Sequence, residues 1–116
     1  MRLNEVTYPG GTPIDGYGPG FVRAGGRVWE GAVLFLPAGP AAWRANDPAP
    51  ILEAAGEIDV LLHGTGPEIA HPDAAFRAAL ESAGIGIEAM ATPAACRTFN
   101  VLLGEGRRVA AALLPV

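Results

Sequence analysis

Residues 58–114 read IDVLLHGTGPEIAHPDAAFRAALESAGIGIEAMATPAACRTFNVLLGEGRRVAAALL, and this stretch decides the fold. Three apolar runs within it, at 58–63, 85–90 and 109–114, have the length and composition of β-strands. The last run is almost entirely apolar, which is typical of a strand inside a sheet. Because strand, helix, strand, helix and strand alternate, we expect at least one right-handed crossover and a sheet covered by helices. The sequence therefore predicts an α/β fold.

The two helices between these strands begin and end at local signals. We expect the first helix to open at Pro72 and to end at Gly84, because proline suits a first helical turn and glycine a helix end. For the second helix, Thr92 is the expected N-cap and Pro93 the first helical residue. The apolar faces comprise Phe76, Leu80 and Ala83 in the first helix and Ala95, Phe99, Leu102 and Leu103 in the second.

The first half of the chain carries a hairpin signal. Gly25-Gly26 supplies the positive φ angles of a two-residue turn, so we expect strands at 21–24 and 27–30 with Val22 opposite Trp29. The glycine- and proline-rich residues before this hairpin, from residue 1 to residue 20, predict irregular turns rather than regular elements.

Two further elements are expected between the hairpin and residue 58. Residues 32–36 are apolar without alternation, as in a strand buried on both faces, and Pro37 ends the run. Gly31 just before it predicts a bulge. A short helix is expected to begin at Asn46 or Asp47 and to end at Gly56.

Length and composition limit the class of protein. The chain has 116 residues, a formal net charge of −4 and one cysteine, which fits a single domain over residues 1–116 without an internal disulfide. The longest charge-free stretch, residues 31–43, is shorter than the roughly 20 apolar residues of a membrane span, and the N-terminus lacks a secretory pattern, so we expect a cytoplasmic protein. Net acidity without a basic cluster argues against nucleic acid as a partner.

Motifs for cofactors and metals are weak. Gly64-Thr65-Gly66 follows a strand, but the third glycine of a dinucleotide fingerprint would fall at Ile69, and prolines intervene before the next helix. The chain contains no lysine, so it has no phosphate-loop lysine. Two histidines and one cysteine lack the paired spacing of a structural zinc site. We therefore expect neither a cofactor nor a metal.

The segment after residue 90 is the main candidate for a ligand site. Thr98 and Asn100 are poor helix formers, and the charge of Arg97 opposes the helix dipole near its start. Breaks of local rules collect at functional sites, and α/β folds open their crevices where strands end. The candidate ligand-binding residues are Gly64, Thr65, Gly66, Thr92, Cys96, Arg97, Thr98 and Asn100. The alternative is structural: Arg97 and Asn100 tie the helix to the N-terminal β region through backbone carbonyls.

Cys96, His63 and Trp43 each have both a functional and a structural interpretation. A catalytic Cys96 with His63 as its base is conceivable, since a helix start lowers a thiol pKa, but a free cysteine is more often a small buried hydrophobe and a histidine at a strand end is more often structural. Trp43 is a candidate interface anchor, and the alternative is that its side chain is buried in the core.

The residues also carry a family resemblance. Phe21, the segment 29–37, the strand end at Gly64-Thr65-Gly66 and the run from Met90 to Asn100 resemble a family of small uncharacterised Mth-type domains. Its animal members include the third mitochondrial complex I assembly factor and an adipogenesis-associated protein. The resemblance implies three layers, with a central mixed sheet of five strands, flanking helices and an added N-terminal β layer. It implies no catalytic residues.

These observations lead to competing functional hypotheses. The first is a non-enzymatic cytoplasmic protein that binds or helps to assemble another, unidentified protein. The second is a domain that binds a small anionic ligand, or an enzyme, that uses the crevice between Gly64-Thr65-Gly66 and the helix start at Thr92. A structural homo-oligomer is a third hypothesis, because the sequence defines no interface.

Overall fold

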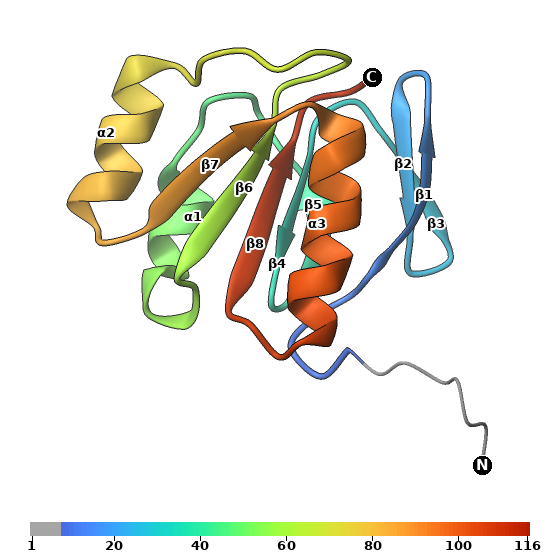
Figure 1. Ribbon diagram of the computed structural model, residues 1–116, viewed down its shortest axis with the longest axis horizontal. Helices are drawn as coiled ribbons and strands as arrows, with labels where there is room; N and C mark the ends of the chain where they lie inside the picture. The colour runs from blue at the N-terminus through green and yellow to red at the C-terminus, as the bar shows by residue number, and fades with distance from the viewer. Residues whose placement is uncertain (1–7) are drawn as a thin grey trace.

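A mixed five-stranded sheet forms the centre of the computed structural model, which describes residues 8–116 (Figure 1). The strand order is β5-β4-β8-β6-β7. These strands are β4 (Val33–Leu36), β5 (Gly39–Ala42), β6 (Val60–Gly64), β7 (Gly86–Met90) and β8 (Val109–Leu113). β6 is parallel to β7 and β8, whereas β4 is antiparallel to β8 and β5. The expected mixed sheet of five strands is confirmed, and β8 is the internal strand that its apolar sequence predicts.

Helices cover both faces of this sheet, as the alternating pattern predicts (Figure 1). On one face lies α3 (Thr92–Gly104), whose side chains Cys96, Phe99 and Leu103 pack with the sheet residues Leu62 and Ala111. The other face packs against α1 (Ala49–Glu53) and α2 (Ala74–Ser82), with a short 3-10 turn, η1 (Ala55–Glu57), after α1. No helix within residues 8–116 has the length and apolar character needed to span a bilayer.

The added β layer lies beside α3 and completes the three-layer arrangement (Figure 1). It is an antiparallel sheet of β1 (Ile14–Gly18), β2 (Phe21–Ala24) and β3 (Arg27–Glu30). Val22 pairs with Trp29, so the predicted hairpin register is confirmed. Ile14, Val22 and Ala24 point into the same core as the inner face of α3.

The first half differs from the prediction at α1, β1 and β5. The short helix begins at Ala49 instead of Asn46 or Asp47, and it ends at Glu53 instead of Gly56. Residues 14–18 form β1 instead of irregular turns, with a register shift between Ile14 and Gly16 that absorbs the irregular glycine spacing. The prediction for residues 1–7 lies outside the described residues. β5 was not expected after Pro37. It contains Pro40, but β5 is at the margin of the sheet, where proline costs no ladder bond.

Candidate functional site

In the predicted crevice, hydrogen bonds within the protein connect the end of β6 to the start of α3. The Thr92 hydroxyl accepts from the Gly66 N–H at 2.9 Å and donates to the Leu114 carbonyl at 2.7 Å. Two backbone bonds, Thr92 N to Gly66 O and Leu114 N to Gly64 O, are both 2.8 Å long. Thr92 is fully buried and is the first residue of α3, not its N-cap, which is Ala91. The Thr92 side chain therefore links three chain segments instead of capping one helix.

Gly64 lets these segments approach closely. A β-carbon at this position would lie 2.7 Å from the Thr92 Oγ1 atom, 2.9 Å from Leu113 Cδ2 and 3.1 Å from the Thr92 Cα. Contacts this short leave no room even for a methyl group. The sequence correctly brings Gly64, Gly66 and Thr92 together, but the polar groups that a ligand would use at Thr92 are bonded within the protein.

Thr65 organises the loop that follows β6. Its hydroxyl accepts from the Ala70 N–H at 3.0 Å and lies 2.8 Å from the Glu68 carbonyl, to which it donates. The Thr65 N–H donates to the Met90 carbonyl at 2.9 Å, which links the loop to the end of β7. The contacts of Thr65 are thus also internal to the fold.

A second group of predicted residues lies on another side of α3, facing β1. An open hollow of about 220 Å³ lies between parts of the two elements. Its lining consists of Ile14, Asp15, Gly16, Tyr17, Cys96, Arg97 and Asn100. We call it the β1–α3 hollow. Since each helical residue turns by about 100°, Arg97 points well away from the buried Thr92, and the single predicted crevice is divided in two. Thr98 is half-buried and lies outside this lining.

Asn100 ties α3 to β1. Its side-chain amide donates to the Ile14 carbonyl at 2.7 Å, and its oxygen accepts from the Ile14 N–H at 2.8 Å. The amide therefore pairs with β1 as a neighbouring strand would. For Asn100 this is the structural alternative that the sequence left open.

Arg97 differs from Asn100 in being exposed. Its side chain forms no hydrogen bond or ion pair with another residue in the range 8–116. On the β1 side of the hollow, Tyr17 is also exposed, at 39%. Neither Tyr17 nor Asp15 was expected at a site, because the glycines around them favoured irregular turns; the alternation within residues 14–18 is the signal that could have placed them.

The environment of Cys96 corrects the hypothesis of a nucleophile. The side chain is buried, and burial raises the pKa of the Cys96 thiol to about 11 although the nearby Arg97 charge opposes the change. The thiolate is the reactive form, so little of it exists at neutral pH. The helix start does not decide the thiol pKa, because removal of the thiol from water has the larger effect on it.

We expect the Cys96 thiol to be unreactive in the folded protein. At pH 8 a pKa of about 11 in place of 9.0 lowers the thiolate fraction about 100-fold. Iodoacetamide should therefore modify the native chain at least about 100-fold more slowly than the chain unfolded in guanidinium chloride, and the native rate should keep rising as pH approaches 11. Mass spectrometry of quenched samples measures both rates. Equal native and unfolded rates would contradict the burial of the thiol.

His63 lies in the opposite core from Cys96. Its Nδ1 is 2.9 Å from the Ala112 carbonyl, so this nitrogen carries the proton and donates. The ring packs against Trp43 and Phe76, with centroid distances of 5.9 and 5.4 Å. Burial lowers the pKa of His63, which keeps the ring neutral. The Cys96–His63 pair, which the sequence offered as an alternative to the structural interpretation, is therefore not formed, because the central sheet separates the two side chains.

Trp43 is also part of this second core. It is only 7% exposed, and its indole N–H donates to the Asp47 carbonyl at 3.0 Å. The prediction of Trp43 as an exposed interface anchor is thus wrong, and the alternative, a tryptophan buried in the core, is correct. Residues 8–116 contain no group of three or more histidine, cysteine or acidic side chains arranged to hold a metal.

Comparison with known proteins identifies the family. A family described as "Protein of unknown function (DUF498/DUF598)" matches residues 14–114. The chain belongs to this family. An uncharacterized protein of Rhodobacter capsulatus is 45% identical over the whole of this chain and 94% of that protein. The mouse protein named NADH dehydrogenase [ubiquinone] 1 alpha subcomplex assembly factor 3 is 34% identical over 99% of this chain, which spans 66% of the mouse protein.

Solved structures of DUF498/DUF598 relatives share the fold. A crystal structure from Bartonella henselae, described as an outer membrane protein, has a TM-score of 0.85 and 38% identity over 95% of this chain and 99% of that chain. A solution structure from Bordetella pertussis, described as a Mth938-like domain, has a TM-score of 0.75 and 30% identity over 99% of this chain and 92% of that chain. The resemblance to the Mth-type family with its complex I assembly factor is confirmed.

Proposed function

We propose that this member of the DUF498/DUF598 family is a non-enzymatic cytoplasmic protein that binds another protein in an assembly-factor-like role. The observation that carries the proposal is the exposed pair Tyr17 and Arg97 at the β1–α3 hollow, with no partner for Arg97 among the described residues. Tyrosine and arginine are enriched among residues that dominate the energy of protein interfaces, because each combines a large contact area with polar groups. The relatives named as complex I assembly factors support the same class of function.

The chemistry of the described residues gives less support to an enzyme. The Cys96 thiol has a raised pKa, and burial lowers the pKa of His63, whose ring lies against Trp43 and Phe76. Asn100 uses its amide to hold β1. Arg97 is an exposed polar group of the β1–α3 hollow that is available to a partner, and it suits recognition better than proton transfer because its guanidinium stays charged.

We expect Arg97→Ala to remove partner binding without unfolding the chain. Truncation of an exposed arginine whose side chain forms no hydrogen bond or ion pair within residues 8–116 should change stability by less than about 0.5 kcal/mol. Binding should weaken at least about tenfold if Arg97 dominates the interface energy. Quantitative capture from the native lysate compares wild type, Arg97→Ala and Arg44→Ala, with circular dichroism of each. Arg44, exposed elsewhere, is the matched control.

The outcomes separate the hypotheses. Retention of a protein by wild type and Arg44→Ala, with loss by folded Arg97→Ala, supports the proposal. Equal capture by all three chains contradicts the role of Arg97, and an Arg97→Ala chain that does not fold makes the residue structural. If no protein is enriched, assembly is the wrong class of function.

The second candidate is binding of a small anion, which the Arg97 guanidinium in the β1–α3 hollow favours. Asp15 in the same lining weakens this candidate, since its carboxylate repels an anion. A ligand at 100 times its dissociation constant adds about 2.7 kcal/mol to stability. A rise in melting temperature with phosphate or a dicarboxylate that Arg97→Ala abolishes would favour the anion site over the protein interface.

A further inference from the structure

One margin of the central sheet, β7, has backbone groups without a neighbouring strand. The Gly86 N–H donates to the Asp59 carbonyl at 3.0 Å, and the Met90 carbonyl accepts from the Thr65 N–H at 2.9 Å, so these two residues face β6. Backbone direction alternates along a strand, so the N–H and C=O groups of Ile87 and Ala89 point away from β6. No other element of residues 8–116 forms a backbone hydrogen bond with these four groups.

Two other sheet margins in the described chain carry features that hinder pairing. Pro40 removes an N–H from β5, and the Asn100 amide occupies both backbone groups of Ile14 on β1. β7 has neither kind of protection. Its one charged side chain is Glu88, which is exposed in the middle of the strand. An unpaired strand of this kind is a template for a further strand.

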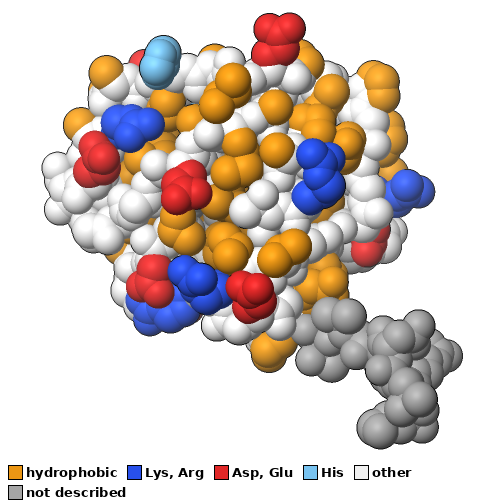
Figure 2. All heavy atoms as spheres, viewed as in Figure 1, with side chains coloured by type: hydrophobic (Ala, Val, Ile, Leu, Met, Phe, Trp, Pro, Cys, Tyr) orange, Lys and Arg blue, Asp and Glu red, His pale blue; other side chains and the backbone are white. Residues whose placement is uncertain are grey.

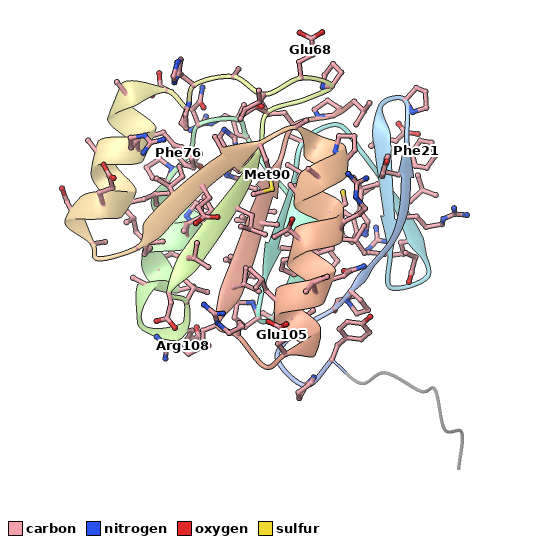
Figure 3. All side chains as sticks on the ribbon, in the orientation of Figure 1. Phe21, Glu68, Phe76, Met90, Glu105 and Arg108 are labelled. Atoms are coloured by element: carbon pink, nitrogen blue, oxygen red, sulfur yellow. The ribbon has the colours of Figure 1, made fainter. Side chains whose placement is uncertain are left out.

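The surroundings of β7 would receive side chains on both faces of an added strand. On the α2 face, an open hollow of about 220 Å³ adjoins Ala89. It is lined by Ile69, Ala70, His71, Pro72, Arg77 and Ala89. On the α3 face, hydrophobic side chains gather between β7 and α3 (Figure 2). The half-buried Val60, Met90 and Leu102 pack against the core on this face. Figure 3 shows Met90 beside α3 and Phe76 on α2, the two helices that flank this strand.

Glu88 decides which partner fits. A second copy of this chain could use all four outward groups of each β7 only in the antiparallel register that pairs Ile87 with Ala89 of the other copy. That register places the two Glu88 carboxylates directly opposite each other, which is destabilising in a sheet. A strand with a basic residue opposite Glu88 has the complementary charge.

We propose that β7 binds an extended segment of another protein, which adds to the sheet as a sixth strand with Lys or Arg opposite Glu88. Small apolar side chains on either side of this basic residue would pack near Ile87 and against the Ala89 hollow. The proposal rests on the proposed protein-binding function, and it places a contact on a surface separate from the β1–α3 hollow. Backbone bonds supply affinity, and Glu88 supplies the preference for charge.

The free protein tests the open edge first. Hydrogen exchange measured by NMR should show Ile87 and Ala89 amides exchanging at least about tenfold faster than the Gly86 amide, which is bonded to β6. Equal protection of these amides at low protein concentration would mean that the edge is covered, and would overturn the proposal. Protection that appears only as protein concentration rises, together with dimers in sedimentation, would identify a second copy as the occupant and would also overturn it.

A synthetic peptide then tests the partner's chemistry. The probe is the palindrome Ser-Thr-Val-Lys-Val-Thr-Ser with blocked ends, which presents the same pattern in either strand direction, and its matched control carries Glu in place of Lys. We expect NMR shifts centred on β7, a dissociation constant of about 1 mM or tighter for the Lys peptide, and binding about two- to fivefold weaker for the Glu peptide. Glu88→Lys should reverse the preference, whereas Glu81→Lys on α2 should keep it. Ala89→Pro, which removes an outward N–H, should abolish binding.

The results distinguish this proposal from the proposed function. The Arg97→Ala chain should bind the Lys peptide as wild type does, because Arg97 is outside the peptide surface. Absence of β7 shifts at millimolar peptide, or equal binding of both peptides, overturns the β7 proposal. Loss of lysate capture with Arg97→Ala would leave the protein-binding function intact even then. Conversely, a β7 site that binds the Lys peptide while no cellular protein is captured would leave only the function in doubt.

Discussion

Gly64→Ala should destabilise the chain by about 2–3 kcal/mol, because the contact between the end of β6 and the start of α3 leaves no space for the added methyl group. The new carbon would meet the Thr92 hydroxyl at 2.7 Å and the Thr92 Cα at 3.1 Å, and backbone atoms do not move aside as a flexible side chain would. Relief requires α3 to shift away from β6, which lengthens the bonds of Thr92 to Gly66 and Leu114. Thermal unfolding followed by circular dichroism should show a fall in Tm of about 10 °C.

Gly56→Ala is the matched control for this change. Gly56 lies in η1, and a β-carbon there meets no atom within 4 Å. Because alanine restricts the unfolded chain, this control should leave stability unchanged or raise it by up to about 1 kcal/mol. If Gly64→Ala and Gly56→Ala gave the same Tm, the close approach of β6 and α3 would not be the reason for glycine at position 64.

The elements that the sequence predicts well are those with strong local patterns. The run 109–114 is apolar on both faces, and β8 is indeed covered by α3 on one side and by the α1–α2 core on the other. The Gly25-Gly26 turn sets the hairpin register, since both glycines have positive φ angles of 61° and 75°. Local chemistry alone is enough for these features.

β1 and β5 depend on partners that a local pattern does not contain. β1 has glycines at positions 16 and 18 and low intrinsic strand preference, and it is held by pairing with β2 and by the Asn100 amide, 86 residues away along the chain. β5 contains Pro40 and pairs with β4 on its other side. Tertiary contacts override local preference in both cases.

Only part of the candidate site could be predicted from the sequence, because the rest also depends on tertiary contacts. The rule breaks at Arg97, Thr98 and Asn100 correctly mark an unusual helix, but each residue has its own environment. Asn100 holds β1, Thr98 is half-buried outside the β1–α3 hollow, and Arg97 is exposed. Sequence spacing predicts which residues share a helix, whereas the packing of the added sheet against α3 decides which of them are used inside the fold.

Asn100→Ala should destabilise the chain by about 2–4 kcal/mol, because it removes two hydrogen bonds and leaves the Ile14 N–H and C=O groups without their partner. Ile14 is 6% exposed, so water replaces the lost bonds poorly. Thermal unfolding should show a fall in Tm of about 8–16 °C. Hydrogen exchange of the Ile14 amide should speed up more than that of β6 or β8, since the loss is centred on β1.

Asn100→Asp distinguishes this hydrogen-bond role from simple packing. The carboxylate can still accept from the Ile14 N–H, but it has no donor for the Ile14 carbonyl and places negative charge against it. Once protonated, the introduced carboxyl regains a donor, so the deficit of this variant relative to wild type should shrink as pH falls. Val101→Ala, at the exposed neighbouring position, should stay within about 0.5 kcal/mol of wild type. A deficit of Asn100→Asp that is the same at every pH would show that shape, rather than the paired donor and acceptor, is what β1 requires of residue 100.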